Sequence, residues 1–230
     1  MQPTTLYEIQ THNVRELNKA WKETTRLINE SYRLKNKPAA ELQTKLLALL
    51  FSAYTEAVFS KLIHTPCALS TTEIENLKGK FKNNSFVGWK HCLNMMVAKI
   101  TSKTASEKDA IRTEIRNILT SYIKKPSEIR NRLAHGQWSI ALNSSNTQKN
   151  LEITEDIDKL DIVKLEVYKK SFDLMALIME DLVESPNKAH IDQYSFRIAK
   201  FYSEQAKMGQ WTKEERLAKL KPKIIPQKVA

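Results

Sequence analysis

The sequence contains very little glycine, and this scarcity argues for a helical fold. Only 4 of the 230 residues are glycine, well below the usual share of about 7%. Proteins built from short strands and tight turns use glycine wherever the backbone needs a positive φ. We therefore expect long helices joined by few turns. A chain of this length is expected to form one domain followed by a tail.

Cysteine and long apolar runs are also scarce. Cys67 and Cys92 lack the spacing of a metal site, so we expect two free, buried thiols in a reducing compartment. No apolar run approaches the ~18–20 residues that span a bilayer, and the longest covers only 46–53. The N-terminus has no basic segment followed by an apolar one. We accordingly expect no signal peptide, no membrane partner and a cytoplasmic protein.

The charge is predominantly of one sign. Lys and Arg number 37 against 26 Asp and Glu, a net charge of +11. Such an excess favours polyanionic partners, either nucleic acid or an anionic membrane surface, and does not choose between them. It is concentrated at 207–230, where seven Lys and Arg face two Glu, a net charge of +5. We predict a helical domain over 1–206 and a basic arm over 207–230, which either binds a partner or only aids solubility.

Hydrophobic periodicity predicts an all-α protein. Apolar residues recur at helical spacing in several segments, bounded by prolines and by residues that cap helices. The main predicted helices cover 14–34, 39–63, 86–100, 106–123, 161–183 and 185–205. Two short runs with β character, 138–142 and 151–154, flank turn-forming residues at 143–146. The sequence therefore predicts an antiparallel helical bundle with a small β-hairpin insertion near 138–154.

The segment 128–136, with the sequence EIRNRLAHG, is the most informative part of the chain. Ser127 can cap a short helix here, and Gly136 can take the left-handed conformation that ends it. Arg130 and His135 are five residues apart, about 140° around an ideal helix. They cannot stack on one helix, but a twofold axis could bring the arginine and histidine of two copies into one cleft.

This pair of residues suits chemistry on a phosphodiester. RNA carries its own nucleophile, the 2′-hydroxyl. Histidine, with a reference pKa near 6.5, can take or give a proton at neutral pH. Arginine stays charged and offers a planar fork to phosphate oxygens. Together they could cleave RNA without a metal or another cofactor, leaving a 2′,3′-cyclic phosphate and a 5′-hydroxyl.

The segment 130–136, RNRLAHG, resembles the signature of the HEPN superfamily: an Arg, a polar residue, three more residues and a His, on a late helix of an all-α bundle. The resemblance covers about seven residues in motif and most of 10–206 in architecture. It implies a helical bundle of the HEPN type. Many members of that family are metal-independent endoribonucleases that work as dimers in phage defence or toxin–antitoxin pairs. Others have lost catalysis and serve as binding modules.

The resemblance implies roles for particular residues. Arg130 and His135 take the catalytic positions, and Asn131 is expected to orient a substrate oxygen or the imidazole. Arg132 is expected to contact the RNA backbone, and Glu128 to hold an arginine in place. These roles predict an endoribonuclease that acts as a toxin or phage-defence effector, with RNA as substrate, a homodimeric state and an antitoxin or defence-system partner protein.

Three alternatives stay open. The chain could be a partner subunit whose bundle docks on a larger enzyme, with the basic arm as a tether. The chain could be a non-catalytic HEPN-like module that binds nucleic acid or a partner protein through its basic surface. Arg130 could also be structural and pair with Glu128 or a neighbouring helix, while His135 bonds a last carbonyl of its own helix.

Overall fold

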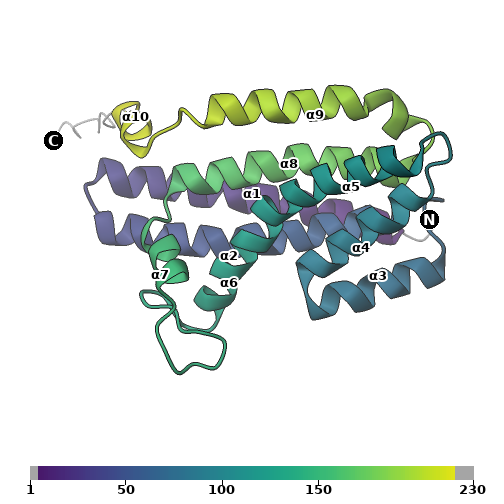
Figure 1. The fold of residues 1–230 in the computed structure, drawn as a ribbon. Coiled ribbons are helices and arrows are strands. Elements are labelled where there is room, and N and C mark those ends of the chain that lie inside the picture. The colour runs from purple at the N-terminus through teal and green to yellow at the C-terminus, as the bar shows by residue number, and fades with distance from the viewer. Residues whose placement is uncertain (1–4, 221–230) are drawn as a thin grey trace.

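The structure, a computed structural model, describes residues 5–220, and this part of the chain is all-helical with no β-strand. Four long helices lie alongside one another in Figure 1. They are α1 (Leu6–Arg33), α2 (Lys37–Ile63), α8 (Ile162–Glu184) and α9 (Ala189–Met208). Helix α1 packs on α2, α2 on α8, and α8 on α9. The all-α prediction is therefore confirmed.

Helix α2 supplies much of the core. Its buried aromatic residues Phe51 and Phe59 meet aromatic rings from other helices edge to face or stacked. By length and composition α2 could cross a membrane, although the sequence contains no uninterrupted apolar run of that length. In the structure, 56% of its most apolar 18-residue stretch is buried inside the bundle. Burial between α1 and α8 therefore accounts for much of the apolar character of α2.

Helices α3 (Thr71–Asn83) and α4 (Ser85–Ala98) form a tight hairpin beside the long helices (Figure 1). Gly88 of α4 allows the close approach, because a Cβ at this position would lie 2.7 Å from the Cβ of Phe81. Cys92 of α4 is buried, as predicted, whereas Cys67 in the loop before α3 is exposed. The prediction of two buried thiols is thus wrong for Cys67.

Helices α5 (Ala105–Leu119) and α6 (Lys125–Ala134) are joined by η1 (Thr120–Lys124), a π-helical turn, and together they cross the bundle diagonally (Figure 1). The sequence predicted a break at Pro126 and an N-cap at Ser127. Instead the helix continues, and the Ser127 hydroxyl donates to the carbonyl of Lys124 at 2.7 Å. A wider turn accommodates proline, which lacks an N–H and would clash with the preceding turn of a regular helix.

The predicted β-hairpin near 138–154 is not found in the described residues. Its only trace is an isolated antiparallel bridge between Leu142 and Lys149. The predicted second strand is the start of α7 (Leu151–Asp158). The side chain of Asn150 accepts a hydrogen bond from the Ile153 N–H at 3.0 Å, which caps this helix. A local cap therefore outweighed the β preference of four residues.

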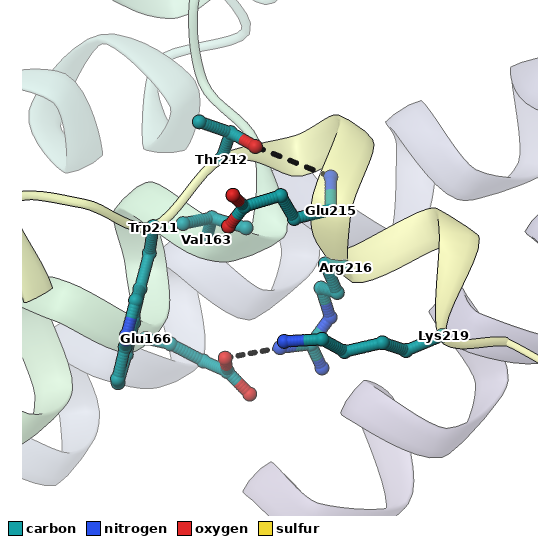
Figure 2. A pocket seen from close by; sticks show the side chains of 7 residues that line it. All are labelled: Val163, Glu166, Trp211, Thr212, Glu215, Arg216 and Lys219. Atoms are coloured by element: carbon teal, nitrogen blue, oxygen red, sulfur yellow. Dashed lines mark hydrogen bonds and ion pairs between the residues drawn. The ribbon is translucent and has the colours of Figure 1, made fainter.

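The chain beyond α9 folds back onto α8. Helix α9 ends at Met208, two residues past the predicted boundary at 206, and a short helix α10 (Lys213–Ala218) follows. Figure 2 shows Trp211 and the ion pair between Arg216 and Glu166 of α8. The ammonium of Lys170 lies 4.4 Å from the centre of the Trp211 ring. The rest of the predicted basic arm, 221–230, lies outside the described residues.

Candidate functional site

Helix α6, which carries the Arg130–His135 motif, is fixed against α2 and α7. Its two apolar residues, Ile129 and Leu133, are 2% and 1% exposed and face the core, as their spacing of four predicts. This anchoring leaves Arg130 half-buried at the junction with α2, and Asn131 exposed beside it. The orientation of the motif is thus set by two core contacts.

The guanidinium of Arg130 is held at three points. Its Nε donates to the Ser52 hydroxyl at 2.9 Å, and its Nη1 donates to Oδ1 of Asn131 at 3.2 Å. Its Nη2 forms an ion pair with the carboxylate of Glu56. The side chains of Arg130 and Glu56 are 33% and 39% exposed. The guanidinium is therefore positioned by the protein and still open to solvent.

The residues on α2 that hold Arg130 were not predicted. Glu128 was expected to orient an arginine, but its Oε1 lies 3.9 Å from the ammonium of Lys124. The orienting contact comes instead from Glu56, with Ser52 one turn earlier on the same helix. Both are polar residues within a predominantly apolar helix, and that contrast was a weak signal in the sequence.

A cavity of about 320 Å³ lies beside Arg130, between α2, the α3–α4 turn and α6. Polar side chains make up most of its wall: Glu56, Lys82, Asn84, Ser85, Ser127 and Asn131. Two of the predicted site residues, Arg130 and Asn131, are therefore brought together at a polar cavity.

His135 lies at the other end of the motif. It is the C-cap of α6 and is exposed, and it does not line the cavity. The helix ends there in a Schellman motif, because Gln137 N–H donates to the carbonyl of Arg132 at 2.9 Å and Gly136 N–H donates to that of Leu133 at 3.1 Å. Gly136 has φ +78°, so its predicted left-handed conformation is confirmed.

Arg132 lies between these two parts of the motif, is partly exposed and contributes its carbonyl to the helix end. Within residues 5–220, no group of three or more His, Cys, Asp or Glu is placed to hold a metal ion.

Comparison with known proteins finds no matching family model, no matching curated protein and no matching solved structure. The likeness to the HEPN superfamily therefore depends on the motif at 130–136 and on the all-helical architecture.

Proposed function

We propose that the protein is a metal-independent endoribonuclease of the HEPN type that acts as a homodimer. The main support is the state of Arg130. A guanidinium has five N–H groups, and the contacts to Ser52, Glu56 and Asn131 use three of them. One N–H remains on each Nη, on a side chain that is fixed and open to solvent. Two such donors suit a bidentate contact with phosphate.

The proposed reaction is an intramolecular attack within RNA. A neutral His135 imidazole takes the proton of the 2′-hydroxyl, the 2′-oxygen bonds to phosphorus, and the P–O5′ bond breaks. A second, protonated imidazole gives its proton to the leaving 5′-oxygen. Arg130 stabilises the additional negative charge on the phosphorane. The products are a 2′,3′-cyclic phosphate and a 5′-hydroxyl.

A second copy would supply what one chain lacks. His135 lies outside the cavity that holds Arg130, and one chain has a single motif, whereas the reaction uses two imidazoles. In a shared cleft, one histidine can serve as the base and the other as the acid. In this proposal the amide of Asn131 orients a substrate oxygen, and Arg132 contacts a neighbouring phosphate. By the same resemblance, the setting is a cytoplasmic toxin or phage-defence effector with an antitoxin or defence-system partner.

The test is cleavage of total RNA by the full-length protein, followed by analysis of the end groups. We expect 2′,3′-cyclic phosphate ends, activity that persists in excess EDTA, and a loss of about 10²-fold or more for His135→Ala. Arg130→Ala should also abolish cleavage. His12→Ala is the matched control, since His12 is an exposed histidine on α1, and it should retain full activity. Inhibition by EDTA, or full activity of His135→Ala, would contradict the proposal.

The non-catalytic alternative is favoured by one observation. Glu56 neutralises Arg130 within the same chain, which is also what a purely structural arginine would show. A binding module would bind RNA without producing new end groups, and His135→Ala would leave its RNA affinity unchanged.

A further inference from the structure

We propose that the cavity between α2, the α3–α4 turn and α6 binds the phosphate of a ribonucleotide, and that Lys82 is the second cation holding it. This inference rests on the proposed function insofar as RNA is the source of that phosphate; a free nucleotide carries the same group. Nothing in the motif at 130–136 points to Lys82, which lies 48 positions before Arg130 in the sequence.

The cavity has a suitable size and lining. Its volume of about 320 Å³ lies at the lower end of the ~300–1,000 Å³ typical of small-ligand sites. Ser85 contributes a hydroxyl to the lining, and Asn84 and Asn131 contribute amides; the hydroxyl of Ser127, also in the lining, already donates to the carbonyl of Lys124. The Ser85 hydroxyl and the two amides donate hydrogen bonds in the way that phosphate oxygens accept them.

The charge of the wall favours an anion. Glu56 already forms an ion pair with Arg130, so its negative charge is compensated. Lys82 is exposed and has no ion-pair partner among residues 5–220. The charged lining residues, Lys82, Arg130 and Glu56, thus leave one net positive charge, which belongs to an ammonium free to contact a ligand.

The α3–α4 turn also contributes to the shape of the wall. Asn84 and Ser85 are the N-cap and the first residue of α4, so the side chains at this turn reach the cavity from the start of a helix. Phe81 supplies an apolar part of the wall, with its ring stacked on Phe59 at a centroid distance of 4.3 Å. A nucleotide, with an anionic phosphate and apolar ring faces, matches this combination better than an inorganic anion does.

The experiment measures binding separately from cleavage. A short, fluorescently labelled, 2′-O-methylated oligoribonucleotide cannot be cut by 2′-hydroxyl attack, and its anisotropy reports affinity for the full-length protein. We expect Lys82→Ala to reduce the slope of log K against log salt concentration by about 0.7, the value for one phosphate contact on a single strand. That slope corresponds to about fivefold weaker binding at ~0.1 M salt, relative to a 1 M reference.

The matched control is Lys78→Ala, which removes the same charge from an exposed position of the same helix that does not line the cavity. Lys78→Ala should change the slope and the affinity less than Lys82→Ala does. Both lysines are exposed, so both variants should unfold at the wild-type temperature.

A second arm identifies the source of the phosphate, with adenosine 5′-monophosphate as the probe. If Lys82→Ala weakens binding of the oligonucleotide but not of the mononucleotide, the cavity is assigned to an RNA chain. Equal dependence for the mononucleotide assigns it to a free nucleotide, and both results support the inference. Identical effects of Lys82→Ala and Lys78→Ala on both probes would overturn it.

The failure of this inference is distinguishable from the failure of the proposed function. If the wild-type protein binds the oligonucleotide through Lys82 but never cleaves RNA, the endoribonuclease proposal fails and the phosphate site stands. If the wild-type protein cleaves RNA while Lys82→Ala binds the oligonucleotide like the control variant, the endoribonuclease proposal stands and the phosphate site fails.

Discussion

The end of α6 provides a sharp test of how the motif is built, through the variant Gly136→Ala. Gly136 has φ +78°, and a left-handed conformation costs an L-residue with a Cβ about 1–2 kcal/mol. The added Cβ meets no heavy atom within 4 Å, so no steric clash adds to this cost. The alanine also reduces the entropy of the unfolded chain, which offsets about 0.4–1 kcal/mol. The expected net loss of folding free energy is therefore about 1 kcal/mol.

The same substitution at Gly79 provides the control. Gly79 lies inside α3 and is exposed, and a Cβ added there would likewise meet no heavy atom within 4 Å. Its φ is not in the left-handed range, since Gly136 is the glycine with positive φ. In an ordinary helix interior, Gly→Ala stabilises a protein by about 0.5–1 kcal/mol. One chemical change should thus have opposite effects at the two positions.

The assay is thermal unfolding of the wild-type protein and both variants under one set of conditions. The two variants should differ by roughly 2 kcal/mol, which corresponds to about 4–8 °C for a protein of this size. If Gly136→Ala were as stable as Gly79→Ala, the Schellman motif would not exist in solution. The local placement of His135, the residue directly before Gly136, would then have to be reconsidered.

Two further predictions concern the α8–α9 side of the bundle. Burial lowers the pKa of His190 to about 4, so between about pH 6.5 and pH 4 the unfolded chain binds a proton that the folded chain does not. The free energy of unfolding should therefore decrease as the pH is lowered from about 6.5 to about 4. Urea titrations of His190→Phe should show a smaller decrease over the same window, and an equal decrease in both proteins would exclude His190 as the cause. Trp211→Ala removes the ring that lies against Lys170, so limited trypsin digestion should cut the segment after α9 faster than in wild type, while cleavage within α2 stays unchanged. Equal rates in that segment would show that Trp211 does not hold it.

Where a helix is defined by local signals, the sequence was sufficient to predict it. Helix α8 begins after Asp161, as predicted, because the Asp161 carboxylate accepts a hydrogen bond from Lys164 N–H at 2.8 Å and caps the helix. Helix α2 was predicted from residue 39 and begins at Lys37, because Pro38 suits the first turn of a helix. Both segments also carry wide apolar faces, so local propensity and packing agree.

Helix α1 was predicted to begin at residue 14 but starts at Leu6. Its first turns place Leu6 and Ile9 largely in solvent, 56% and 42% exposed, so they show no buried periodic face. The start is set by a capping box, in which the hydroxyl of Thr5 accepts from Glu8 N–H and Glu8 reaches back to Thr5. The residues of these turns that are partly covered, Tyr7, Gln10 and Thr11, include two polar ones, so apolar periodicity does not detect this face.

The candidate site was predictable only in its local part. The motif gave Arg130, Asn131 and the helix end at Gly136, all within seven residues. The contacts from Ser52 and Glu56 come from 78 and 74 residues earlier in the chain. Their position depends on how α2 and α6 cross, which is a property of tertiary packing that local spacing does not contain. For the same reason the α3–α4 turn, with Lys82, could not be assigned to the site.

The π-helical turn η1 has a consequence for the register of everything that follows it. A π turn holds one residue more than a regular turn, and each residue corresponds to about 100° of rotation around a regular helix. Deleting one residue from 120–124 would favour a regular helix and rotate α6 by about that angle relative to α5. Arg130 would then lose its contacts with both Ser52 and Glu56, although neither of these residues had been changed. The phase of one helix thus depends on a single additional residue located two turns upstream.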